Sequence, residues 1–167
     1  MKTMLPAKVE RLAREVIEAN RKAGRTIAAA ESCTGGLVSA ALTEIPGSSA
    51  VLQAGFVTYS NEAKIKTLKV SEDLIDTFGA VSIAVAWAMA QGALKVSNAD
   101  VAVAISGVAG PDGGTPQKPV GTVVFAFAER GKDPEKVVAD KIEFGEDKSR
   151  ADIRMSATLH ALQLLLP

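Results

Sequence analysis

The stretch Thr26-Ile27-Ala28-Ala29-Ala30-Glu31-Ser32-Cys33-Thr34-Gly35-Gly36 decides the fold class of this chain. Its first five residues form a short apolar run, which predicts a buried strand. After the two glycines, residues 37–45 predict a helix, and Pro46-Gly47 ends it. A strand that passes through a glycine turn into a helix is the first of several such units along the sequence.

Helices and strands alternate on both sides of this unit. Upstream, apolar residues with helical spacing predict a helix that Gly24 ends. Near the C-terminus, a short polar link at residues 131–134 joins two predicted strands, so we expect a hairpin. This order predicts an α/β fold class, as a single layered α/β/α domain with a mixed sheet over residues 1–167. Further strands are expected at 51–59, 100–105, 120–128 and 137–144, and further helices near 62, after Ser71, at 83–96 and after Ser149, the last with an apolar face of Ala151, Met155, Leu159, Leu162 and Leu166.

The composition excludes several classes of protein. Of 167 residues, 47% are hydrophobic, and 19 basic residues balance 19 acidic ones. No net field favours nucleic acid or an anionic membrane, so neither is expected as a partner. The single cysteine excludes a disulfide framework within the chain, and no apolar leader or bilayer-length run is present, so we expect a cytoplasmic protein. With one histidine, His160, a Cys/His zinc site is not expected, and neither a metal nor a cofactor is predicted.

Three polar segments follow predicted strands, at residues 31–36, 58–64 and 106–115. Ligands of α/β sheets bind outside the carboxyl ends of strands, so one sheet could bring these segments together. The first offers hydroxyls and free N–H groups at a helix start, which attract anions. The third is a glycine-rich loop that could cradle a phosphate, although it lacks the ending of a P-loop. An ordinary helix cap and a surface turn are the alternative interpretations.

A rim of hydroxyls, free N–H groups and one lysine suits attack on an amide. The candidate nucleophile is Ser32 or Cys33, and Ser32 is favoured because Cys33 is expected to point into the core. His160 is expected to be a partly buried structural side chain, which leaves Lys64 or Tyr59 as the base. A lysine base needs its pKa lowered by desolvation or neighbouring cations.

A phosphate would also need a cation. Lys148, Arg150 and Arg154 cluster at the start of the last helix. Arginine suits bidentate phosphate contact better than lysine does. A solvated charged face is the alternative interpretation.

Long motifs make the sequence similar to a known family. Four blocks and their continuation at 118–123 resemble the signature of the CinA C-terminal domain family, over essentially the whole chain. These blocks are Glu31-Ser32-Cys33-Thr34-Gly35-Gly36, the stretch from Gly55 to Lys64, Gly79-Ala80-Val81-Ser82, and the stretch from Ile105 to Gly114.

The resemblance implies hydrolysis of the amide of nicotinamide mononucleotide, giving nicotinate mononucleotide and ammonia, by a stand-alone form of this domain. It implies Ser32 as nucleophile and Tyr59 and Lys64 as residues that activate it or orient the substrate. Family members show a Gly-Asp-Arg stretch before the last helix, from which residues 144–150 depart, so either Arg150 or Lys148 would meet the phosphate. The remaining substrate-binding residues that it implies are Glu31, Thr34, Gly35, Gly36, Ser106 and Gly107.

Two other functions stay open at this point. One is a nucleotide-binding module without catalysis, linked to competence or DNA damage. The other is an amidase for a different small amide. The many small Ala, Gly and Val residues also allow a homo-oligomer.

Overall fold

Five strands form one mixed sheet at the centre of the computed structural model, which describes residues 2–167. The strand order is β2-β1-β3-β4-β5. Strands β2 and β3 run parallel to β1, whereas β4 is antiparallel to β3 and β5 to β4. The predicted mixed sheet and terminal hairpin are therefore confirmed. The strands are β1 (Ile27–Glu31), β2 (Leu52–Val57), β3 (Val101–Gly107), β4 (Thr122–Glu129) and β5 (Val138–Glu143).

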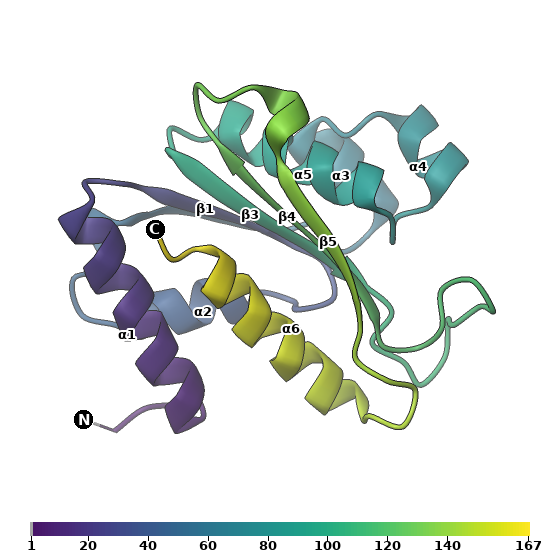
Figure 1. The fold of residues 1–167 in the computed structure, drawn as a ribbon, viewed down its shortest axis with the longest axis horizontal. Coiled ribbons are helices and arrows are strands. Elements are labelled where there is room, and N and C mark those ends of the chain that lie inside the picture. Colours follow the sequence, from purple (N-terminus) through teal and green to yellow (C-terminus); the bar gives the residue numbers. More distant parts are fainter. Residues whose placement is uncertain (1) are drawn as a thin grey trace.

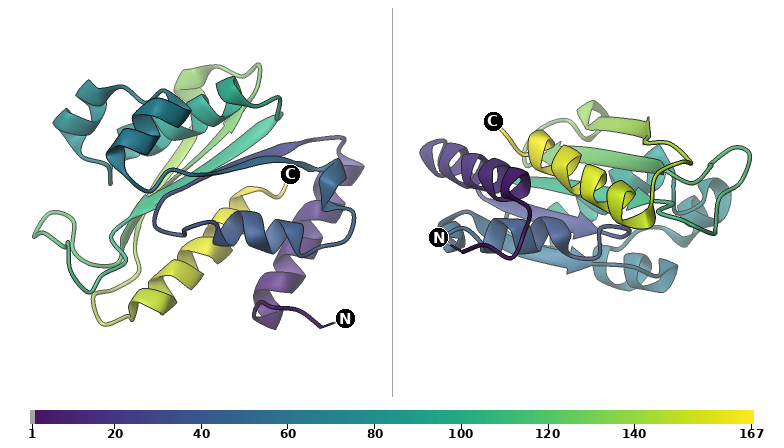
Figure 2. Two further views of the ribbon diagram at one scale, coloured as in Figure 1. Left: turned by 180° about the vertical axis from the view of Figure 1, so that it is seen from behind. Right: turned by 90° about the horizontal axis from the view of Figure 1, so that it is seen from below.

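Helices cover both faces of this sheet (Figure 1). Helices α1, α2 and α6 pack on one face, and α3, α4 and α5 lie over the other, as the views from behind and from below also show (Figure 2). The α/β/α layering predicted from the sequence is confirmed. The helices are α1 (Ala7–Lys22), α2 (Leu37–Thr43), α3 (Asn61–Leu68), α4 (Glu72–Phe78), α5 (Ile83–Val96) and α6 (Arg150–Leu164).

The two faces of the central strands carry side chains of different size. Successive residues of a strand point to opposite faces. In β1 and β3 the larger Ile and Val side chains join the cluster under α1, α2 and α6, whereas alanines face α5. Helix α5 itself presents buried alanines to the sheet. Small residues on both surfaces let α5 lie close to the strands.

Helix α5 also approaches the end of α3 closely at Gly92. A Cβ atom at this position would lie 1.9 Å from the carbonyl oxygen of Leu68. Only glycine leaves room for that carbonyl. The contact fixes the position of α3, which carries Lys64 in its first turn.

The apolar face predicted for α6 is partly wrong. Ala151 is exposed, and Leu162 is the one member of the predicted face that is fully buried. The row of Ile153, Ala157 and Ala161 is completely buried instead. The two alanines allow the helix axis to lie close to the sheet, which places Met155, Leu159 and Leu166 at the margin of the core.

In residues 2–167, no helix combines the length and the apolar character that a membrane span requires.

Candidate active site

The carboxyl ends of the three parallel strands meet at one edge of the sheet. In the register of the sheet, Glu31 at the end of β1 pairs with Val57 of β2 and with Ile105 of β3. The residues that follow line a cavity of about 290 Å³. The prediction that the three polar segments come together is therefore confirmed. From the predicted set the cavity is lined by Ser32, Cys33, Tyr59, Lys64, Ser106, Gly107 and Arg150.

Lys64 lies beside Ser32 in this cavity. Its Nζ is 2.9 Å from Ser32 Oγ, and it donates hydrogen bonds to the carbonyl oxygens of Thr58 at 2.8 Å and Tyr59 at 3.1 Å. The Ser60 hydroxyl caps α3 by accepting a hydrogen bond from the Ala63 N–H, which sets the direction of the first helical turn. Two of the three hydrogen-bonding directions of Nζ are thus taken by backbone carbonyls, and the third is directed at the Ser32 hydroxyl.

Burial changes the acid–base properties of Lys64. The side chain is 1% exposed, and no carboxylate forms an ion pair with it within residues 2–167. Desolvation disfavours the ammonium form and lowers the pKa of Lys64 from 10.5 to about 8. About a tenth of the molecules therefore carry the neutral amine at pH 7, against far fewer for an ordinary lysine. In the neutral amine, the two N–H groups donate to the two carbonyls, and the lone pair is left to accept a hydrogen bond from the Ser32 hydroxyl.

The thiol of Cys33 is the weaker candidate nucleophile. Cys33 is 4% exposed, and burial raises the pKa of its thiol to about 11. The thiolate is the reactive form of cysteine, so this thiol is inert at neutral pH. A Cβ atom at Gly107 would lie 3.1 Å from Cys33 Sγ, which shows that the thiol packs against the end of β3.

Glu31 and Thr34 have structural partners, which differs from the substrate contacts predicted for them. Both are fully buried, and the Thr34 hydroxyl donates to Glu31 Oε1 at 2.7 Å. The Glu31 carboxylate also accepts hydrogen bonds from the backbone N–H of Val38 and from both the N–H and the hydroxyl of Ser39. It caps the orphan N–H groups of α2 and leaves no free face toward the cavity. The sequence did not reveal this because Glu31 lies outside the usual capping position.

Glycines allow the turn after Ser32 to form. Gly35 and Gly36 have φ values of 59° and 98°, in the left-handed region that favours glycine. The two are not among the residues that line the cavity, and their role in substrate binding stays a prediction. Gly55 on β2 leaves space for Ser39, because a Cβ atom there would lie 2.2 Å from Ser39 Oγ.

Arg150 and Tyr59 form a second polar group at the exposed side of the cavity. Arg150 Nη2 donates to the Tyr59 hydroxyl at 3.1 Å, and Nη1 donates to the carbonyl of Gly110. Tyr59 is 61% exposed and directs its hydroxyl to Arg150, so Lys64 is the residue that contacts Ser32. Of the two alternatives for the phosphate, Arg150 lines the cavity and Lys148 does not.

Arg154, the third cation of this cluster, holds the backbone of the turn. Its Nε donates to the carbonyl of Cys33 at 3.0 Å and its Nη2 to the carbonyl of Thr34 at 3.3 Å. The sequence could not predict either contact, because Arg154 lies 121 positions from Cys33 and 120 from Thr34.

The connection from β3 to β4 covers one side of the cavity. Ser106 and Gly107, predicted to begin this loop, are the last residues of β3 and pair with β4. The Ser106 hydroxyl donates to the carbonyl of Ala80 at 2.9 Å. Lys118 Nζ donates to the carbonyl of Phe78 at 2.6 Å, which links the loop to the end of α4. The other lining residues had no individual role predicted from the sequence, although residues 61 and 108–113 lie in two of the predicted polar segments; they are Asn61, Ala80, Val81, Val108, Ala109, Gly110, Asp112 and Gly113.

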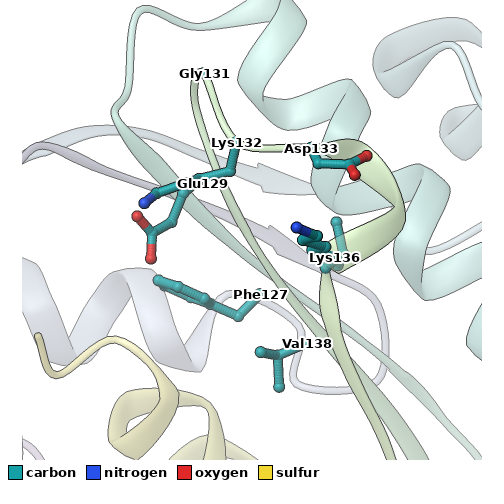
Figure 3. Close-up of a pocket in the computed structure, with 8 residues that line it drawn as sticks. Phe127, Glu129, Gly131, Lys132, Asp133, Lys136 and Val138 are labelled. Atoms are coloured by element: carbon teal, nitrogen blue, oxygen red, sulfur yellow. The ribbon is translucent and has the colours of Figure 1, made fainter.

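A different cavity, of about 380 Å³, lies at the opposite end of the sheet (Figure 3). It is formed at the turn between β4 and β5, and charged side chains of both signs surround it with Phe127 and Val138. It contains no serine, cysteine or histidine. The cavity at Ser32 is therefore the better candidate for an active site.

His160 and the acidic residues supply no further centre. His160 packs on the Phe125 ring with a centroid distance of 4.4 Å, and burial lowers its pKa. It takes no part in the cavity, as predicted. Across residues 2–167, His, Cys, Asp and Glu form no group of three suited to a metal ion.

Comparison with known proteins identifies the relatives of this chain. The family profile of the CinA C-terminal domain matches residues 9–167. The chain is 47% identical to the nicotinamide-nucleotide amidohydrolase PncC of Escherichia coli (strain K12), over 97% of this chain and 95% of that protein. The PncC protein of Enterobacter agglomerans is also 47% identical, with 98% and 96% covered.

Solved structures and longer relatives also resemble this chain. The crystal structure of the competence/damage inducible protein CihA from Agrobacterium tumefaciens matches with a TM-score of 0.93 and 44% identity, covering 98% of this chain and 97% of that one. A relative in Symbiobacterium thermophilum is 53% identical over 147 residues, but the chain spans only 34% of its length. By its family profile, its near full-length relatives and its fold, this chain belongs to the CinA C-terminal domain family.

Proposed function

We propose that this chain hydrolyses the carboxamide of nicotinamide mononucleotide, with Ser32 as nucleophile and Lys64 as its base. The observation that carries the proposal is the 2.9 Å contact between Ser32 Oγ and the desolvated amine of Lys64. The choice of substrate rests on the two PncC relatives, which match over nearly their whole length. The whole chain then acts as one amidohydrolase domain.

The reaction follows from the arrangement of these two groups. Neutral Lys64 takes the proton of Ser32, and Oγ attacks the carbonyl carbon of the amide. When the C–N bond breaks, the Lys64 ammonium returns the proton to the leaving nitrogen, and ammonia departs. A water molecule, deprotonated by Lys64, then hydrolyses the acyl-serine and releases nicotinate mononucleotide.

The other cavity residues suit the rest of this substrate. Arg150 presents a guanidinium at the exposed side of the cavity, which suits a phosphate dianion. The Ser106 hydroxyl donates to Ala80, so its lone pairs are free to accept a hydrogen bond from the carboxamide nitrogen. Tyr59 orients Arg150 through its hydroxyl. We place this reaction in the cytoplasm, which the single free thiol of Cys33 supports.

Ammonia release from nicotinamide mononucleotide tests the proposal. Ser32→Ala is expected to lower kcat by at least about 10³-fold, because activated serine nucleophiles contribute this much or more. The matched control Cys33→Ala keeps its activity, since the neighbouring thiol takes no part. Binding of the nucleotide without turnover by the wild type would instead identify a binding module. Release of ammonia from other small amides only would point to a different amidase.

A further inference from the structure

Arg154 makes contacts that the proposed reaction does not use. It lies on α6 one turn after Arg150, and its guanidinium donates to the carbonyls of Cys33 and Thr34. It forms no ion pair with a carboxylate in residues 2–167. Its donors are therefore directed to the carbonyls of the two residues that follow the nucleophile.

The same turn is also held by Glu31. Its buried carboxylate binds Thr34 and the first residues of α2 through four hydrogen bonds. The guanidinium lies directly over the turn, because a Cβ atom at Gly35 would be 3.1 Å from Arg154 Nη2. The chain after Ser32 is thus anchored by two side chains, Glu31 and Arg154.

These anchors matter because Ser32 and Lys64 belong to separate segments. The two residues are 32 positions apart, and their side chains meet only because the turn and α3 are each fixed. In a trans peptide the C=O and N–H groups point in opposite directions. Holding the carbonyls of Cys33 and Thr34 therefore fixes the orientation of the Cys33–Thr34 and Thr34–Gly35 peptide planes, which begin one residue after Ser32.

We propose that Arg154 is a positioning residue, which holds the turn of Ser32 in place against Lys64 without contacting the substrate. The proposal rests on the proposed roles of Ser32 and Lys64. It divides the arginines of α6 between two tasks. Arg150 lines the cavity and faces the substrate, whereas Arg154 is not among the lining residues and acts through the backbone.

Steady-state kinetics separate these two tasks. Arg154→Ala is expected to lower kcat by about 10- to 100-fold with a change in KM below about threefold, because a displaced nucleophile slows the chemical step. Arg154→Lys keeps the charge but loses the fork of donors, so its kcat should lie between those of Arg154→Ala and the wild type. Arg150→Ala should mainly raise KM. Arg14→Ala removes an arginine of α1, paired with Glu10, and serves as the matched control without effect.

A second readout is independent of the substrate. A small alkyl fluorophosphonate reacts with an activated serine: Oγ bonds to phosphorus, fluoride leaves, and the hydroxyl proton passes to Lys64. The labelling rate of Ser32, followed by mass spectrometry, should fall in Arg154→Ala by a factor similar to that in kcat. If the wild type is labelled but releases no ammonia from the mononucleotide, the proposed substrate is wrong, while the labelling rates still decide the role of Arg154.

Three results would overturn the positioning role. The first is a rise in KM at unchanged kcat in Arg154→Ala, which would make Arg154 a substrate contact. The second is wild-type turnover and labelling in that variant. The third is failure of both Arg154→Ala and Arg154→Lys to fold, as judged by thermal melting, which would show that the residue serves the fold alone. A wild type that is neither labelled nor active would contradict this proposal together with the proposed function.

Discussion

Replacement of Lys64 by methionine tests the proposed mechanism most directly. The amine is buried, it contacts Ser32 at 2.9 Å, and desolvation lowers its pKa to about 8. Methionine fills a similar volume but cannot accept a proton. General bases contribute roughly 10²- to 10⁴-fold to rate, so Lys64→Met should lower kcat by at least about 10².

The lowered pKa also predicts how the wild-type rate depends on pH. With a pKa of about 8, the neutral amine rises from roughly a tenth of the molecules at pH 7 to roughly nine tenths at pH 9. The rate of ammonia release should therefore rise about tenfold between these values and then level off.

Stability should follow the same titration. The folded-state pKa lies below the unfolded value of 10.5, so the folded state carries a penalty while Lys64 is charged in both states. This penalty is complete below pH 8 and disappears as pH rises from 8 to 10.5. Between pH 7 and pH 9 the free energy of unfolding should gain about 1 kcal/mol from this group, and this gain should be absent in Lys64→Met.

The assays are ammonia release and urea unfolding, each measured from pH 7 to pH 9 for the wild type and Lys64→Met. Lys66→Met, an exposed change on the same helix, serves as the control. A flat rate profile over this range, or a Lys64→Met variant with wild-type kcat, would refute the role of Lys64 as base.

Three further substitutions test the contacts that build the site. Glu31→Gln places an amide among four hydrogen-bond donors, so urea unfolding should show a loss of about 3 kcal/mol; an unchanged midpoint would contradict its role as cap of α2. Gly92→Ala forces a Cβ atom against a backbone carbonyl 1.9 Å away, so thermal melting should show a loss of about 2 kcal/mol or more, with lower activity because α3 moves. Gly55→Ala meets Ser39 Oγ at 2.2 Å and Ser39 Cβ at 2.8 Å; the hydroxyl can rotate at the loss of one hydrogen bond and the Cβ contact needs a small backbone shift, so its loss should be about 1.5 kcal/mol, below that of Gly92→Ala. A Gly55→Ala variant less stable than Gly92→Ala would contradict this comparison.

Most of the fold was predictable because its signals are local. Hydrophobic spacing and the positions of glycine and proline indicated the order of helices and strands. Ser60, Ser82 and Ser149 each cap a helix by accepting a hydrogen bond from the backbone N–H three residues later, whereas Ser71, expected to cap α4 in the same way, makes no such side-chain bond. The chemistry of strand ends was also predictable, since the carboxyl ends of parallel strands share one edge of a sheet.

The sequence by itself determined the α/β/α class, the mixed sheet and the set of polar segments at one sheet edge. Only the tertiary structure decided that Lys64, and not Tyr59, contacts Ser32, and that Arg150 rather than Lys148 lines the cavity. It also showed that Glu31 bonds to the start of α2 and that Arg154 bonds to the backbone of the turn after Ser32. The physical reason is distance along the chain: these contacts join residues up to 121 positions apart, and desolvation depends on what surrounds a side chain, not on its neighbours in sequence.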